Sequence, residues 1–412
     1  MRVAVVAEWY PSPADPVHGI WAHRQALAAR AAGVEVRVLA LRRPVPPLAV
    51  ARRLARWPPE GRALREWAHG ARRSLRATSL DGLEVQPVTW LGPPRPLSYG
   101  AWGYWMAPPL ARALDRLHEA WPFAVLHAHC LAPAGHAAAR WTARRAGSAR
   151  PAFVVSAHGP DMINVPERSL VGRRACLTAL HEADRVLANS RWARRRCEEL
   201  AGGALAVSVV HLGADLVQRP PERAGPVKLV TVAHLQARKR HDIVLRALAR
   251  LPDSAGRPHY LVIGDGEERG ALERLAAALG LSGRVRFLGQ LPNPEAVAEV
   301  AGCDLFVMPG VEEPFGVAFV EAMAAGVPAI GGRGEGGPED IAAAGEGMLL
   351  VAPGDVEELA ALLARLCTDR AELRQLGAAA RSTVAANFTW EQCGRRTVAA
   401  YGDALAAAGR GR

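Results

Sequence analysis

Short apolar runs alternate with helix-like segments along this chain of 412 residues, and the series occurs twice. We expect strands in the first half at Val3–Val6, Val34–Leu39, Leu83–Val88, Phe123–His127, Phe153–Ser156, Arg185–Ala188 and Val207–Val210. After a polar, proline-containing join at 218–226, we expect strands at Lys228–Ala233, Tyr260–Ile263, Val285–Leu288, Leu305–Met308, Ala329–Gly331 and Met348–Val351. This alternation predicts parallel sheets built from strand–helix units. The length suits two domains of about 200 residues each.

Helical patterns lie between these strands. We expect helices near Trp21–Ala32, Met106–His118, Pro133–Ala146 and Arg191–Leu200, and long helices from Val356 onward. The proline-rich stretch Pro44–Pro59 predicts a surface loop that leads into a basic helix, and Pro93–Pro109 is expected to be irregular.

The net charge of +11 has its densest source in residues 41–80. This segment holds Trp57, Trp67 and only two acids, Glu60 and Glu66, beside ten arginines: Arg42, Arg43, Arg52, Arg53, Arg56, Arg62, Arg65, Arg72, Arg73 and Arg76. Arginine with tryptophan favours an anionic membrane surface, where each basic group contributes about 1 kcal/mol. A solvated basic helix is the alternative. Nucleic acid is not expected as a partner, because no recognised nucleic-acid motif accompanies the charge.

The apolar runs are shorter than the roughly 20 residues that span a bilayer. The start, MRVAVVAEWYP, is typical of a first strand rather than a signal peptide. Six scattered cysteines without a C-x-x-C motif suit a reducing cytosol and argue against a zinc site or a disulfide framework. We therefore expect a cytoplasmic protein, with a peripheral position on the inner face of the plasma membrane as a further expectation.

The stretch from Glu312 to Ile330, EEPFGVAFVEAMAAGVPAI, carries the most chemical information. Pro314 suits the first turn of a helix, and Gly316 lets a ligand approach the backbone. A helix that starts here offers free N–H groups to phosphate or sugar oxygens. Glu313 and Glu321 would then lie up to about 12 Å apart. That exceeds the roughly 5 to 9.5 Å of paired carboxylates acting on one glycosidic bond, so the two acids suit the two ends of a long ligand.

This stretch resembles the signature of the retaining glycosyltransferases of family 4, and the likeness extends from Lys228 to about Tyr401. The first half resembles the family more loosely. The resemblance implies a GT-B fold, in which two Rossmann-like domains face each other across a cleft. We predict an acceptor-binding domain at 1–217 and a donor-binding domain at 218–388. A last helix at about 389–412, beginning near Phe388-Thr389-Trp390-Glu391, is expected to cross back to the first domain.

Lys239 is one of only two lysines in a chain that otherwise uses arginine, which suggests a compact ammonium at a phosphate site. In the resembling family, a lysine at this point binds the donor diphosphate. An arginine usually stands five residues earlier, where this chain has His234, so Arg238 or Arg240 is an alternative second cation. A neutral imidazole at His234 would still donate one hydrogen bond.

Two further candidates lie in the first half. Gly19 follows the first strand and opens the first helix, where a glycine permits close approach to a diphosphate. Many relatives carry two adjacent glycines here, whereas this chain has His18-Gly19. His158 follows another strand, at a place where the family carries a histidine that reaches toward the transferred sugar. His127 and His129 flank a strand end without a third metal ligand, so acceptor contact or packing is the expectation.

Two other nucleotide-binding motifs are incomplete. Gly264-Asp265-Gly266 follows a strand, but Arg269 occupies the position of the third glycine in a dinucleotide-binding motif. Neither lysine follows a glycine, so the chain also lacks the phosphate-binding loop of nucleotide triphosphatases.

By resemblance, Glu313 would bind sugar hydroxyls and Glu321 the ribose hydroxyls, while the amides of Phe315, Gly316 and Val317 orient the sugar. Lys239, with His234 and Gly19, would stabilise the leaving diphosphate, which is electrostatic catalysis aimed at a developing anion. The family's retaining course is usually written as attack on the same face, with a phosphate oxygen taking the acceptor proton.

We therefore predict a metal-independent hexosyltransferase without a cofactor. It would use a UDP- or GDP-sugar and a glycan or polyprenyl-linked or other lipid-linked acceptor, as in the synthesis of cell-envelope polysaccharide. A nucleotide-sugar epimerase or phosphorylase of the same fold is an alternative. A catalytically silent scaffold that binds sugar nucleotides is another.

Overall fold

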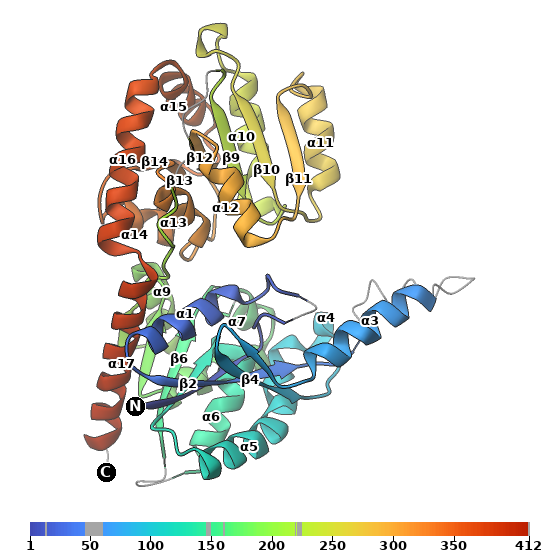
Figure 1. Cartoon of the computed structure of the whole chain (residues 1–412), viewed down its shortest axis with the longest axis vertical. Coiled ribbons are helices and arrows are strands. Elements are labelled where there is room, and N and C mark those ends of the chain that lie inside the picture. The colour runs from blue at the N-terminus through green and yellow to red at the C-terminus, as the bar shows by residue number, and fades with distance from the viewer. Residues whose placement is uncertain are drawn as a thin grey trace. The chain divides into compact units, whose positions relative to one another are not determined.

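The computed structural model describes residues 1–12, 15–45, 61–145, 150–159, 161–218, 220 and 225–410. The chain divides into two compact units (Figure 1). Unit 1 comprises 1–189, 193–210 and 393–412, and unit 2 comprises 190–192 and 211–392. Each unit is built on its own sheet, and the predicted α/β fold with mostly parallel sheets is confirmed.

Unit 1 contains an eight-stranded sheet in the order β3-β4-β2-β1-β5-β6-β7-β8. Its strands are β1 (Arg2–Ala7), β2 (Glu35–Arg42), β3 (Thr78–Leu80), β4 (Leu83–Thr89), β5 (Val125–His129), β6 (Ala152–Ala157), β7 (Arg185–Ala188) and β8 (Val207–Val209). All neighbours are parallel except the pair β3 and β4. The central strands β5 and β6 are buried along their whole length, as expected for a parallel sheet covered on both faces. Strand β3 was not predicted, because it is short and largely exposed.

The helices of unit 1 are α1 (Ile20–Ala31), α3 (Gly61–Ser74), α4 (Arg95–Ser98), α5 (Trp102–Ala120), α6 (His136–Thr142), α7 (Asn164–Arg168), α8 (Leu170–Glu182) and most of α9 (Arg191–Ala201). The long helix α17 (Trp390–Arg410) belongs to unit 1 from Cys393 onward. There, the Gln25 side-chain amide of α1 donates to the Thr397 hydroxyl at 3.0 Å. Tyr401 is buried, and its hydroxyl is 2.8 Å from Nδ1 of His127.

The prediction of an irregular segment at Pro93–Pro109 is wrong over much of its length. Helix α5 begins at Trp102 and continues through Pro108 and Pro109. Its buried face, which includes Trp102, Met106 and Leu110, supplies the packing energy that a helix with internal prolines needs. Pro108 itself is exposed, which places the missing N–H on the solvent side.

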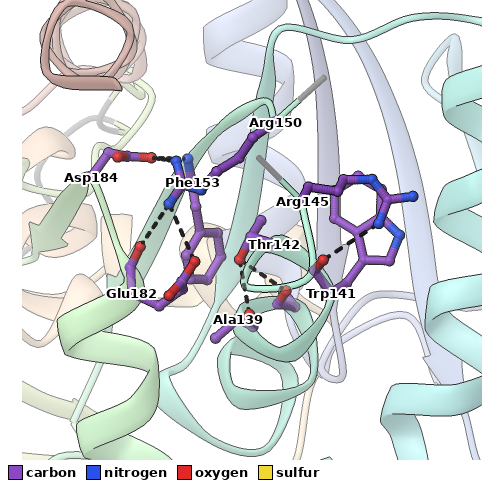
Figure 2. A network of polar contacts seen from close by, with 9 residues as sticks. Ala139, Trp141, Thr142, Arg145, Arg150, Phe153, Glu182 and Asp184 are labelled. Atoms are coloured by element: carbon purple, nitrogen blue, oxygen red, sulfur yellow. Dashed lines mark hydrogen bonds and ion pairs between the residues drawn. The ribbon is translucent and has the colours of Figure 1, made fainter. Parts of the chain in front are cut away.

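A polar network joins the amino ends of β6 and β7 (Figure 2). The Arg150 guanidinium donates to Asp184 Oδ2 at 2.7 Å and to the Glu182 carbonyl at 3.1 Å. The Phe153 amide also donates to Asp184 Oδ2 at 2.7 Å. Beside this network, the Arg145 guanidinium lies 3.7 Å from the ring centre of Trp141. The charges at this edge of the sheet therefore have partners within the protein.

Unit 2 contains six parallel strands in the order β11-β10-β9-β12-β13-β14. They are β9 (Lys228–Val232), β10 (His259–Ile263), β11 (Val285–Gly289), β12 (Leu305–Met308), β13 (Ala329–Gly332) and β14 (Met348–Val351). The helices are α10 (His241–Ala249), α11 (Arg269–Ala278), α12 (Asn293–Ala301), α13 (Val317–Ala324), α14 (Gly336–Ala342), α15 (Val356–Thr368) and α16 (Arg370–Asn387). Asp355 and Asp369 cap α15 and α16 by accepting the amides of Glu358 and Glu372, each at 2.9 Å. All six strands predicted for this half are present.

The basic segment 41–80 is described only in part. Residues 46–60, with Arg52, Arg53, Arg56 and Trp57, lie outside the described residues. Arg42 donates to the carbonyls of Tyr10 and Pro11, each at 2.8 Å, and Arg43 donates to the Gly92 carbonyl. These two arginines therefore stabilise the fold through bonds to backbone carbonyls. Helix α3 occupies the place of the predicted basic helix.

Candidate functional site

In unit 2, the loops that follow β9 and β12 bring Lys239 and Glu313 together. Lys239 ends a 3₁₀ turn at Ala237–Lys239, and its ammonium forms an ion pair with Glu313 Oε2. Both residues are buried. Burial lowers the pKa of the Lys239 ammonium, and the Glu313 carboxylate opposes that shift. A buried pair of this kind is stabilised only while both partners are present. The sequence placed these residues 74 positions apart, so their contact is a result of the fold.

The Glu313 loop leads into α13, but not as predicted. The helix begins at Val317, so Pro314 lies outside its first turn. Gly316 precedes the helix with φ = +76°, a left-handed conformation that interrupts the helical path and favours glycine. The side chain of Phe315 is buried against His211, with ring centres 5.6 Å apart. Phe315 can therefore offer only its backbone to a ligand, and the same holds for Gly316, which has no side chain. Val317 is the first residue of the helix.

Glu321 lies on α13, about one turn after Val317. Its Oε1 accepts a hydrogen bond from the side-chain amide of Asn293 at 3.0 Å. Asn293 is the first residue of α12. The two acids of the motif therefore have different surroundings: Glu313 is buried beside a cation, whereas Glu321 is partly exposed and bound to a neutral amide.

The loop that carries His234 is supported by the Gly264-Asp265-Gly266 segment after β10. The Leu235 amide donates to the Asp265 carbonyl at 3.0 Å. A Cβ atom on Gly264 would lie 1.9 Å from the Ala233 carbonyl oxygen, so only glycine permits this approach. His234 itself is exposed. The two glycines thus position the lysine loop, a role that the sequence analysis did not assign to them.

Arg238 was an alternative cation for the donor. Its guanidinium donates to the Gln236 side-chain oxygen and to the Glu312 carbonyl, each at 3.2 Å. Arg240 pairs with Asp242 at 3.3 Å. Both arginines therefore have partners within unit 2.

In unit 1, Gly19 lies directly before α1 with φ = +79°. A Cβ atom at this position would be 2.2 Å from the carbonyl carbon of Trp9. The neighbouring His18 forms a 2.6 Å contact between Nδ1 and Asp15 Oδ2. Gly19 is thus required by the turn itself, and the helix N-terminus behind it is where the sequence predicted a diphosphate contact.

His158 belongs to a cluster of histidines at the carboxyl ends of β5 and β6. Its Nε2 is 3.1 Å from Nδ1 of His129, and the rings are stacked with centres 5.3 Å apart. The Trp21 ring lies 4.0 Å from the His158 ring. His127 contacts Tyr401 and, through Nε2, the Ser156 hydroxyl at 2.7 Å. Burial lowers the pKa of His127 and of His158 to about 3 and that of His129 well below its ordinary value. All three rings are therefore neutral at physiological pH.

Two acidic residues of unit 1 that the sequence analysis passed over support or flank this cluster. Asp161 accepts the amides of Leu131 at 2.9 Å and Gly159 at 2.8 Å, so one carboxylate ties together the loops after β5 and β6. Glu8 directly follows β1 and accepts the Tyr99 hydroxyl at 3.1 Å. Burial raises the pKa of Glu8 to about 7, although the nearby Arg95 opposes the shift. The available signal was their position just after a buried strand, where ligand sites of parallel sheets occur.

Two family models match the chain in succession. Residues 19–218 match the model described as Glycosyltransferase Family 4, and residues 215–383 match Glycosyl transferases group 1. A GDP-mannose-dependent alpha-(1-6)-phosphatidylinositol monomannoside mannosyltransferase of Mycolicibacterium smegmatis is 31% identical over 62% of this chain and 70% of its own length. The chain belongs to the group 1 glycosyltransferases, with the first-half signature of family 4.

One further relative and one solved structure mark the range of the likeness. An MMP alpha-(1->4)-mannosyltransferase of Mycolicibacterium hassiacum is 33% identical, and the match spans 48% of each chain. The structure of a sucrose-phosphate synthase from Thermosynechococcus elongatus superposes with a TM-score of 0.76 over 99% of this chain and 100% of that one. Its sequence identity of 21% supports the GT-B fold alone.

The described residues contain neither a candidate membrane-spanning helix nor a candidate metal site. In 1–12, 15–45, 61–145, 150–159, 161–218, 220 and 225–410, no helix has both the length and the apolar character that a membrane crossing requires. The same part of the chain contains no group of three or more histidine, cysteine, aspartate or glutamate side chains arranged to hold a metal ion.

Proposed function

We propose that this glycosyltransferase moves a hexose from a UDP- or GDP-sugar to a glycan or lipid-linked acceptor, with retention of configuration and without a metal ion. The observation that carries the proposal is the buried ion pair between Lys239 and Glu313, which lies just before the amino end of α13. A cation, a carboxylate and free helix amides in one place suit a diphosphate attached to a polyhydroxylated ring.

In this proposal, Lys239 stabilises the charge that grows on the leaving diphosphate, and the exposed His234 donates one further hydrogen bond. Glu313 accepts hydroxyl groups of the sugar, and Glu321 accepts those of the ribose. The amides of Phe315, Gly316 and Val317 orient the sugar. A phosphate oxygen of the donor takes the acceptor proton on the face from which the diphosphate leaves. The hexose is thus transferred with its configuration retained and without a protein nucleophile.

Unit 1 contributes neutral groups in this proposal. His158 donates or accepts one hydrogen bond to the transferred sugar, and the amides behind Gly19 contact the diphosphate. A lipid-linked acceptor is supported by the Mycolicibacterium smegmatis relative, whose name specifies a phosphatidylinositol monomannoside. That name also specifies GDP-mannose, which favours testing GDP-sugars beside UDP-sugars.

A donor-hydrolysis screen over UDP- and GDP-linked glucose, galactose, mannose and N-acetylglucosamine tests the proposal. We expect release of one nucleoside diphosphate, and we expect EDTA to leave the rate unchanged. Release that depends on added divalent metal would contradict metal independence. Isomerisation of the donor without release would favour an epimerase, and phosphorolysis of a glycan would favour a phosphorylase. Tight donor binding without any turnover would favour a scaffold.

The expected peripheral attachment to the inner face of the plasma membrane has its own test. Flotation with anionic and neutral vesicles at low and high salt should show binding to anionic vesicles that salt weakens, since exposed basic groups are screened. No binding to anionic vesicles would leave a cytoplasmic enzyme and the solvated basic helix as the explanation of residues 41–80.

A further inference from the structure

Glu312, which directly precedes Glu313, has an unusual backbone conformation. Its φ of +54° lies in the left-handed region, which costs a residue other than glycine, asparagine or aspartate free energy. Such conformations persist only where surrounding contacts hold them, and they concentrate at functional sites. The turn at Glu312 decides where the Glu313 side chain points, so the contacts that hold this turn bear directly on the ion pair with Lys239.

Arg238 holds the turn from one side. Its guanidinium donates to the Glu312 carbonyl at 3.2 Å, and its own carbonyl accepts the Val311 amide at 2.8 Å. These bonds join the Glu313 loop to the loop that carries Lys239. They do not involve the amide of Glu313, which needs a partner of its own because the residue is buried.

Glu335 holds the turn from the other side. Its Oε2 accepts the Glu313 amide at 3.0 Å, and the Gly337 amide donates to the Glu313 carbonyl at 3.1 Å. Glu335 lies between β13 and α14, so it joins a third strand end to the site. Burial raises the pKa of Glu335, and the nearby Glu313 carboxylate raises it further against the lowering effect of the backbone hydrogen bonds. The side chain thus serves as a hydrogen-bond acceptor for the backbone, not as a partner for a cation.

We infer that Glu335 is a positioning residue for the transfer reaction: it holds the left-handed turn at Glu312, so that the Glu313 carboxylate lies against Lys239. This inference rests on the proposed function of Glu313 and Lys239. A displacement of a catalytic group by about 1 Å can cost roughly 100-fold in rate, which sets the effect to look for.

The helix that follows Glu335 supplies a matched control. Glu339 of α14 also uses its carboxylate as a backbone acceptor, taking the Gly334 amide at 2.7 Å, but that bond is exposed and does not touch the Glu313 loop. Glu335→Ala, Glu335→Gln, Glu339→Ala and Glu339→Gln therefore separate loss of a bond at the site from loss of an equivalent bond beside it.

We expect Glu335→Ala to lower kcat about 100-fold while the donor KM changes little. Glu335→Gln retains a neutral acceptor oxygen, so it should restore kcat to within about threefold of the parent protein. Both Glu339 variants should retain the parent kcat. Equal kcat values for the two alanine variants would overturn the inference. A Glu335→Gln variant as impaired as Glu335→Ala would also overturn it, because charge rather than backbone support would then be the requirement.

Hydrogen exchange of a peptide that contains Glu313 provides a readout that does not need activity. Glu335→Ala should raise the exchange rate of the Glu313 amide at least tenfold, since its acceptor is gone, whereas Glu339→Ala should not. If the parent protein transfers no sugar, the proposed function fails, and faster exchange in Glu335→Ala still supports the structural half of the inference. Unchanged exchange in that variant overturns it.

Discussion

The polar clusters at the carboxyl ends of the two sheets are built from opposite kinds of groups. In unit 2, Lys239 and Glu313 form a buried ion pair. In unit 1, the buried His127 and His129 and the partly buried His158 are neutral rings that contact one another or hydroxyl groups. Both clusters occupy the edge of a parallel sheet where ligands bind. The same architecture thus carries an ion pair at its centre in one unit and a group of neutral imidazoles in the other.

The difference corresponds to the chemistry that each unit would meet. A leaving diphosphate gains negative charge. A buried cation that a carboxylate holds in position can stabilise this charge. Sugar hydroxyls carry no charge, and a neutral imidazole offers one donor and one acceptor without the cost of burying an ion. Removal of the charges in unit 2 and protonation of the neutral histidines in unit 1 should therefore have distinct effects.

The largest effect is expected from Glu313→Gln. The substitution removes the counter-charge of a buried cation, so transfer should fall about 100- to 1000-fold. The free energy of unfolding should also fall by about 3 kcal/mol, because Lys239 is left buried without its partner. Initial rates at saturating donor and thermal unfolding measure the two effects.

The double variant Lys239→Met/Glu313→Gln separates the two effects. Removal of both charges should restore most of the stability, since a neutral pair of similar size avoids the desolvation cost. It should not restore transfer. Recovery of transfer in the double variant would mean that the ion pair acts only through stability, and the contrast between the units would lose its functional meaning.

The neutral histidines should make unit 1 sensitive to acid. The unfolded chain takes up a proton at each histidine near pH 6.5, whereas folded His127 and His158 do so only at about pH 3. Stability therefore falls as the pH is lowered between these values, by about 2 kcal/mol per histidine at pH 5. In unit 2, burial lowers the pKa of His241 to about 4, so this histidine should also make its unit sensitive to acid.

Acid titration followed by tryptophan fluorescence tests this prediction, because the buried Trp141 reports on unit 1. His158→Gln cannot take up a proton, so its acid transition should move to lower pH. A transition that stays in place or moves to higher pH would contradict the neutral state of His158.

Asp161→Asn should have the next largest effect. Its two carboxylate oxygens accept the amides of Leu131 and Gly159. An asparagine has only one acceptor oxygen, so its NH₂ group would face one of these amides and leave that buried donor unpaired. We expect a loss of about 3 kcal/mol, which lowers the melting temperature of a unit of this size by roughly 6 to 12 °C. A change below 2 °C would show that this carboxylate does not hold the loops of the histidine cluster.

The sequence predicted the strands well and the loops poorly. Strands β12 and β14 have the predicted bounds because each is a short apolar run that begins directly after a polar or glycine residue, Asp304 or Gly347. Helix α5 was predicted only from Met106 and was missed over Trp102–Trp105, since local proline rules do not reveal how strongly Trp102 is buried. Tertiary packing overrides local preference at such positions.

The sequence predicted which residues belong to the site, but it did not predict the contacts between them. Lys239 and Glu313 were both named, but their pairing depends on two loops that only the strand order brings together. Glu335 and Asp161 were passed over because each acts on backbone amides, and this use of a carboxylate has no sequence motif. The start of α13 was placed too early because the left-handed conformation of Gly316 is not evident from its neighbours.

The smallest effect on transfer is expected at the opposite edge of the sheet in unit 1, where the charged groups are paired (Figure 2). Asp184→Ala removes the acceptor of both the Arg150 guanidinium and the Phe153 amide. Loss of these bonds should cost about 2 kcal/mol of stability, because both donors are partly buried. The kcat should stay within about twofold of the parent value, since the amino ends of β6 and β7 lie at the edge opposite the histidine cluster. A tenfold fall in kcat, measured well below the melting temperature, would mean that the two edges are coupled and that the division between a supporting edge and a reactive edge does not hold.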